Sequence, residues 1–231
     1  MVNVTVAQLL KSGVHLGHKI SYWNPKMFPY LYSELNGIHI IDLIQTHQLL
    51  KKTCRFVRKA AEEKKTFLFV GTKPQARNII KEEAIRSGSF YINQRWYGGL
   101  LTNWRTVRNR LKTLIDLEEN ETLLASLSKK EASNLRKKLG KLKGPLGGIK
   151  KMKRRPDIII IVDQNYDKTA VREAKKLKIP IISILDSNCD PDLADFPIPG
   201  NDDGINSIKY IIQALADSIY VGRAKRKRLK K

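Results

Sequence analysis

The sequence predicts an α/β protein in which a mostly parallel, doubly wound sheet of about five strands lies between two layers of helices. Two observations predict the sheet: short apolar runs rich in β-branched residues, and helical stripes that alternate with them. A third observation is a heptad spacing after residue 101, which predicts an antiparallel helical hairpin inserted into the chain. With 231 residues, 42% of them hydrophobic, the chain is long enough to bury a sizeable core.

Three apolar runs predict buried parallel strands, because each is nearly continuous and ends at a loop residue: 66–70, 158–162 and 181–185. Shorter runs at 38–41 and 90–92 would complete a sheet of about five strands. Apolar stripes with helical spacing follow the runs, within residues 76–85, 170–177 and 208–219. This order of strand, loop and helix is typical of a doubly wound sheet.

The predicted hairpin has two apolar seams with a spacing of three and four residues. The first starts after Thr102, a plausible N-cap, and comprises Trp104, Val107, Leu111 and Leu114. The second comprises Ala132, Leu135, Leu139, Leu142 and Leu146, after a capping box at 128–131. Each seam is too narrow to hold a helix in water alone, so we expect the two arms to cover each other as a coiled coil.

These features divide the chain into three parts. Residues 1–101 and 149–221 form the expected globular α/β domain, residues 102–148 the hairpin, and residues 222–231 a basic tail. The formal net charge is +22, with 44 Lys and Arg against 22 Asp and Glu. Residues 102–155 carry 16 basic and 5 acidic side chains and the tail carries 7 basic ones, whereas residues 156–221 carry 6 basic and 11 acidic. Such a one-signed excess favours a polyanionic partner, above all nucleic acid.

Other classes of protein fit the sequence less well. No stretch approaches the roughly 20 apolar residues that span a bilayer. Two distant cysteines predict neither a disulfide framework nor a metal site, and the N-terminus has no signal-peptide or transit-peptide pattern. We therefore expect no membrane association, a reducing compartment, and use in the compartment of synthesis unless a presequence has been removed.

Several polar motifs have both a functional and a structural interpretation. Residues 71–73 leave a strand in a place suited to phosphate, although neither GxxxxGK[ST] nor GxGxxG occurs. The carboxylates at 186–195 and 201–203 could serve a metal or acid–base site, but they also suit turns, and Asn201 or Asp202 could cap the last helix. His15 and His18 could share a helical face, yet no third metal ligand is near, so we expect no metal and no cofactor.

The segment 93–110 is the most specific of these motifs. It combines Trp96 and Trp104 with a Gly98-Gly99 pair and several arginines. Arginine contacts phosphate oxygens through a fork of donors, and aromatic rings either stack on bases or fill a joint in the fold. We assign the tryptophans mainly to packing and the arginines to RNA.

Seven ordered strings resemble the family of the small-subunit ribosomal protein "S two", in its bacterial and organellar form. They are GVHLGH (13–18), WNPKM (23–27), GIHIIDL (37–43), FVGTK (69–73), RWYGGLLTNW (95–104), LGGIK (146–150) and IPGNDD (198–203). The resemblance covers residues 8–223 and implies a flavodoxin-like domain that binds small-subunit rRNA and neighbouring ribosomal proteins, including in bacteria the mRNA-binding protein "S one". It implies no catalysis, no small-molecule substrate and no homo-oligomer.

The basic residues that we expect to contact rRNA phosphates are Lys26, Arg95, Arg105, Arg108, Lys150, Lys151, Lys153, Arg154, Arg155, Arg223, Lys225, Arg226, Lys227 and Arg228. The chain departs from many bacterial members in having the basic run 151–155 in place of a Gly-rich stretch, and a short basic end in place of a longer acidic one. Its Lys- and Ile-rich, compact form favours a plastid origin over an AT-rich bacterium, and hence the stroma over a bacterial cytoplasm.

Two other functions remain as alternatives. The first is an enzyme for phosphosugars or nucleotides on the same sheet, with Gly71 to Lys73 holding phosphate and Asp163 or Asp186 as acid or base. The second is a DNA-binding regulator, which the lack of a recognisable reading helix disfavours.

Overall fold

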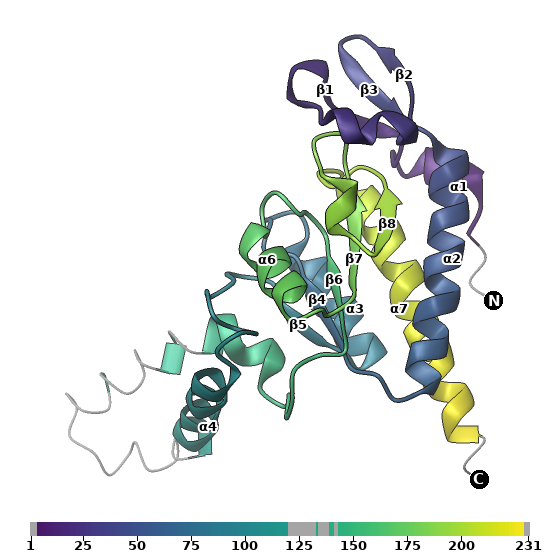
Figure 1. Cartoon of the computed structure of the whole chain (residues 1–231). Coiled ribbons are helices and arrows are strands. Elements are labelled where there is room, and N and C mark those ends of the chain that lie inside the picture. The colour runs from purple at the N-terminus through teal and green to yellow at the C-terminus, as the bar shows by residue number, and fades with distance from the viewer. Residues whose placement is uncertain (1–3, 120–132, 134–138, 141–142, 229–231) are drawn as a thin grey trace.

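A computed structural model describes residues 4–119, 133, 139–140 and 143–228 of the chain. Its main sheet has five parallel strands in the order β5-β4-β6-β7-β8, with bounds β4 Phe67–Val70, β5 Phe90–Ile92, β6 Ile158–Ile161, β7 Ile181–Leu185 and β8 Phe196–Pro199 (Figure 1). Numbered along the chain, this is the order 2-1-3-4-5 of doubly wound, flavodoxin-like sheets. The predicted parallel sheet is confirmed.

Helices cover both faces of this sheet, each over its own hydrophobic core. On one face lie α2 (Leu43–Glu62), α3 (Arg77–Ser87) and α7 (Ile205–Arg228), over the inward side chains of β4, β6 and β7. On the other lie α6 (Lys168–Lys176) and α4 (Trp104–Glu119). The three central strands are buried at every position, which explains their unbroken apolar sequence.

The strand count agrees with the prediction, but one of the expected strands belongs elsewhere. Residues 38–41 form β3 of a separate antiparallel sheet, between β1 (Leu16–Lys19) and β2 (Leu31–Leu35). Its burial alternates along the strand, as in a sheet covered on one face. The fifth parallel strand is β8, which contains Pro197 and Pro199 and pairs only with β7, at an edge where proline is tolerated.

The segments before α2 connect the small sheet to the main domain. Helix α1 (Val6–Lys11) packs on α2, and two short 3₁₀ helices, η1 (Ile20–Tyr22) and η2 (Pro25–Tyr30), lie between β1 and β2. Figure 1 places the small sheet beyond the carboxyl ends of the parallel strands. Later 3₁₀ turns are η4 (Gly147–Ile149) and η5 (Pro191–Leu193).

Helix α4 occupies the residues predicted for the first arm of the hairpin, whereas most of the second arm lies outside the described residues. Its seam residues Val107, Leu111 and Leu114 are buried in the second core, and Trp104 is packed against it. The helix begins at Trp104, so Asn103 and not Thr102 precedes it, and the Thr102 hydroxyl donates to Glu173 instead. In the second seam Leu139 and Leu146 are buried in the same core. Ala132, Leu135, Leu142 and the capping box lie outside the described residues.

Helix α7 runs as far as Arg228, so residues 222–228 of the expected basic tail continue the helix. Gly222 brings α7 close to α2, because a Cβ there would lie 2.4 Å from the carbonyl oxygen of Arg58. Among the described residues no helix combines the length and hydrophobicity needed to cross a membrane.

Candidate nucleic-acid interface

Residues 95–104 form a compact loop that one carboxylate holds together. Buried Glu173 of α6 accepts hydrogen bonds from the Trp96 Nε1–H (3.0 Å), from the backbone N–H of Gly99, Leu101 and Thr102 (2.8, 2.9 and 3.1 Å), and from the Thr102 hydroxyl. Burial alone would raise the pKa of Glu173, but these donors outweigh it and lower the pKa. Trp96 is thereby assigned to packing, as predicted, and the start of α4 is fixed to the main domain.

Gly99 makes the bend in this loop, with φ +86° in the left-handed region that glycine tolerates. The loop leaves the side chains of Arg95, Arg105 and Arg108 exposed around the start of α4. None of these three has a hydrogen bond or ion pair with another described residue. Their guanidinium groups are available to an external anion.

A basic groove lies beside α4, between this helix and the segment that follows η4. It has a volume of about 650 Å³. Among the described residues its lining consists of three apolar side chains, no carboxylate and five cations: Arg108, Lys112, Lys150, Lys151 and Lys153. We call it the α4 groove. Lys150 pairs with Glu118 of α4, whereas Lys151 and Lys153 are exposed and have no partner among the described residues. The predicted basic run therefore forms a surface with α4.

Two residues of the basic run make contacts within the fold. The Arg155 Nε–H donates to the carbonyl oxygen of Leu101 at 2.8 Å, and Arg154 pairs with Asp157 at 3.0 Å. Asp157 in turn accepts from the backbone and hydroxyl of Thr66, just before β4. Arg154 and Arg155 are thus partly engaged within the fold.

Of the other predicted cations that the structure describes, some are paired within the fold and some are not. Lys26 pairs with Asp190 and Asp192 at 2.9 and 2.7 Å, and Lys225 pairs with Glu62 at 3.1 Å. Arg223 donates to the carbonyl oxygens of Ser87 and Gly88, which end α3. Arg226 has no such partner among the described residues. The side chains of Lys227 and Arg228 lie outside the described part.

The carboxyl ends of the parallel strands carry a second charged region, which we call the acidic pole. Lys73 Nζ lies 3.1 Å from Asp163, 2.8 Å from Asp202 and 2.5 Å from Asp203. Burial would lower the pKa of Lys73, but the carboxylates raise it, Asp202 most strongly. This is the crevice where doubly wound enzymes bind ligands. Here the chain's own ammonium pairs with the carboxylates, which argues against the phosphate-binding interpretation of residues 71–73.

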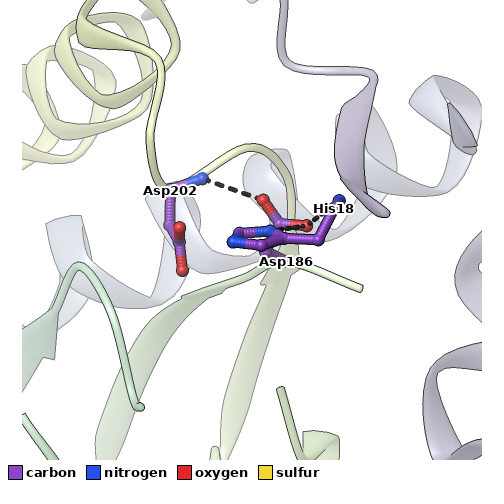
Figure 2. Close-up of side chains that lie close together, drawn as sticks. All are labelled: His18, Asp186 and Asp202. Atoms are coloured by element: carbon purple, nitrogen blue, oxygen red, sulfur yellow. Dashed lines mark hydrogen bonds and ion pairs between the residues drawn. The ribbon is translucent and has the colours of Figure 1, made fainter. Parts of the chain in front are cut away.

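His18 joins the same region from β1, which is a strand and not the helix considered above. Its Nδ1 lies 3.0 Å from Asp186 and its Nε2 lies 3.2 Å from Asp203. Figure 2 shows the imidazole beside Asp186, whose other oxygen accepts from the backbone of Asp202. The hydrogen bond with Asp186 is the main cause that raises the pKa of His18 to about 9. The imidazolium therefore compensates the carboxylates.

The acidic pole also contains donor atoms with the proximity that a metal ion requires. Those of His18, Asp186 and Asp202 lie within 4.8 Å of one another, and so do those of Asp163, Cys189 and Asp202. Burial raises the pKa of Asp202 to about 7, and it raises the pKa of the Cys189 thiol well above its ordinary value. A protonated thiol is a poor ligand. Lys73 and His18 already supply positive charge to these carboxylates.

Asn201 and Asp202 have different roles from the cap predicted for the last helix. The Asn201 side chain accepts from the backbone N–H of Asp203 and Gly204, at 2.8 and 2.7 Å, and so forms the turn before α7. Asp202 faces Lys73 instead. The interpretation of 201–203 as turn chemistry is right for Asn201 and wrong for Asp202.

Sequence reasoning missed two residues that matter here. Lys112 lies one helical turn after Arg108, so its position in the α4 groove follows from an i, i+4 spacing. Glu173 had no local signal, because its partners lie more than 70 residues earlier in the chain.

Comparison with known proteins supplies the family. The sequence profile of a family described as "Ribosomal protein S2" matches residues 9–222. A "Small ribosomal subunit protein uS2c" of Guillardia theta is 62% identical over 223 residues, 96% of this chain and 95% of the relative. The protein of the same name from Rhodomonas salina is 58% identical over 96% of this chain and 92% of its own. A "Small ribosomal subunit protein uS2" of Microcystis aeruginosa is 56% identical over 95% of this chain and 84% of its own. The chain therefore belongs to the ribosomal protein S2 family.

Proposed function

We propose that this chain is a structural constituent of the small ribosomal subunit that attaches to rRNA through the α4 groove and the exposed arginines beside it. The observation that carries the proposal is the groove itself: five cations line it and, among the described residues, no carboxylate does. Phosphate contacts of this kind position a protein on RNA without reading its sequence. The protein acts by attachment and not by catalysis.

The sorting of the predicted cations supports this assignment. Apart from Arg226 near the end of α7, those with no internal partner among the described residues lie around α4, and Arg95, Arg105, Arg108, Lys151 and Lys153 are all exposed. When such a cation neutralises a phosphate, the counterions condensed on the RNA backbone are released, which makes binding depend on salt. Glu173 and Arg155 hold the loop and α4 in place, so the groove is formed before RNA arrives.

The partners and the location follow from the relatives. Other proteins of the small subunit would be neighbours of this chain, and the small sheet, which Figure 1 shows away from α4, offers them a surface. Two relatives carry the name uS2c and come from algae, whereas the third comes from a cyanobacterium. We favour the plastid ribosome as the place where the chain works.

The test compares binding of the full chain to small-subunit rRNA for two triple variants that each remove three charges. R108A/K151A/K153A removes three of the five cations of the α4 groove, and K52A/K176A/K209A removes exposed lysines on other surfaces. We expect the first to lower the association constant at least tenfold and to reduce the slope of log K against log salt by about two, since each phosphate contact contributes ~0.7 to 0.9. Equal effects of both variants would contradict the assignment to this groove.

A further inference from the structure

A second basic groove lies where the sheet begins, near the carboxyl ends of α3 and α7. It has a volume of about 730 Å³, and its charged lining comprises Lys64, Lys65, Arg86, Arg223 and Arg226. Tyr220 also lines it and is 57% exposed. We call it the α7 groove. Figure 1 shows the end of α7 at the opposite end of the parallel strands from the small sheet.

Within the part of the chain that the structure describes, no carboxylate lines the α7 groove, although acidic residues lie close behind it. Arg86 is held from outside by Glu83 and Asp217, and Arg223 by the carbonyl oxygens that end α3. These contacts fix the two guanidinium groups as parts of the wall. Lys65 and Arg226 have no side-chain partner among the described residues.

The cations in this groove are close enough to oppose one another. Burial lowers the pKa of the Arg223 guanidinium, and the charge of Arg226 lowers it further. An anion in the groove would relieve this repulsion and would also accept hydrogen bonds from the N–H groups of Arg223 that the carbonyl oxygens leave unused. The groove is therefore complementary to an oxyanion.

An exposed aromatic ring beside these cations narrows the class of partner. A phosphate or a carboxylate could use only the hydroxyl of Tyr220 as a donor, whereas the exposed ring offers a face for stacking. Single-stranded RNA offers both parts, because its backbone carries phosphates and its bases stack on aromatic rings.

We infer that the α7 groove is a second RNA-binding surface, in which Lys65, Arg223 and Arg226 hold phosphates and Tyr220 stacks on an unpaired base. The inference rests on the proposed function and adds Lys65, Arg86 and Tyr220 to the residues predicted from the sequence. The basic C-terminal segment thus acts as one wall of a shaped site. Gly222 places that wall, because it allows α7 to approach α2 closely just before Arg223.

The experiment uses the full chain, small-subunit rRNA as the probe, and two double variants. K65A/R226A removes the two unpaired cations of the groove, and K52A/K209A removes two exposed lysines elsewhere. We expect K65A/R226A to reduce the salt slope by about 1.5 and the control to leave it nearly unchanged. Y220A should weaken binding roughly fivefold or more, whereas Y220F, which keeps the ring, should bind as the wild type does.

Three results would overturn the inference. K65A/R226A could match its control while R108A/K151A/K153A still loses affinity, which would leave the proposed function standing and remove the second site. The variant could retain full RNA affinity but lose occupancy on assembled small subunits, which would assign the groove to a protein partner. Y220F could fall as far as Y220A, which would exclude stacking. Failure of the wild-type chain to bind rRNA would instead overturn the proposed function.

Discussion

The α4 groove and the acidic pole are both rich in charged side chains, yet they differ in how the charges are balanced. At the pole, Lys73 and His18 are surrounded by carboxylates at 2.5 to 3.2 Å. In the α4 groove, Lys151 and Lys153 are exposed and have no carboxylate among the described residues. The difference teaches that pairing, more than the number of charges, separates a region that stabilises the fold from one that binds a polyanion.

We expect the largest loss of stability when the ammonium group of Lys73 is removed from the acidic pole. K73M should lower the free energy of unfolding by about 3 to 5 kcal/mol, because it leaves Asp163 and Asp202 buried without their partner. Urea unfolding measures this change in the free energy of unfolding, and K81M on an exposed face of α3 is the matched control. A loss no larger than that of K81M would mean that the ion pairs contribute little. If the crevice served a ligand, a nucleotide or a sugar phosphate would raise the melting temperature of the wild type, which we do not expect.

A smaller effect should follow at the joint between the sheet and α4. E173Q should cost about 2 kcal/mol near neutral pH, because a carboxylate that accepts five hydrogen bonds is replaced by an amide. The pKa of Glu173 is lowered from its ordinary value of 4.5, so its stabilisation is present above that pH and is lost as the pH falls below it.

The stability curves of E173Q and the wild type should therefore converge on acidification. The exposed Glu82 offers a control, since E82Q should follow the wild type at all pH values. A gap between wild type and E173Q that stays constant down to pH ~3 would show that packing and not charge explains the loss.

The smallest effect on stability is expected within the basic run, where Arg155 is hydrogen-bonded and, among the described residues, Lys153 is not. R155A should lower the free energy of unfolding by about 1 to 2 kcal/mol, because Arg155 is hydrogen-bonded to the carbonyl oxygen of Leu101. K153A should change it by less than about 0.5 kcal/mol, since that side chain is exposed and unpaired among the described residues. Binding to rRNA should show the reverse order. If R155A and K153A had equal effects on stability and equal effects on rRNA binding, the two residues would not have the different roles that we assign to them.

Much of the fold could be predicted because a strand that is buried on both faces has a nearly continuous apolar sequence. Strands β4, β6 and β7 are buried throughout and were predicted nearly to the residue. Strand β8 was missed because its two prolines contradict a central strand, although they suit an edge. Helix α2 was not singled out because Thr46 and Thr53 interrupt its buried stripe, where their hydroxyls donate to the carbonyl oxygens of Asp42 and Leu49.

The candidate site could be predicted as a set of residue types but not as a set of roles. The predicted cations that the structure describes are mostly exposed, yet Arg154 and Lys26 are paired with carboxylates whereas Lys153 has no partner among the described residues. Asp157, three residues after Arg154, is a local signal for that pair, whereas the partners of Lys26 lie more than 160 residues away and are set by tertiary packing. The contribution of Lys65 and Arg86 to the α7 groove likewise depends on how distant elements meet.

The location of the acidic pole has a consequence for the encounter between protein and RNA. Residues 156–221 carry 6 basic and 11 acidic side chains, and the pole lies at the carboxyl ends of the strands, away from the end of α7. A molecule with charge distributed so unevenly has a large electric dipole, and the field of a phosphate backbone turns such a dipole as the two approach. The chain would meet its site with the basic end first, which raises the association rate at low salt and disfavours collisions in the reversed orientation.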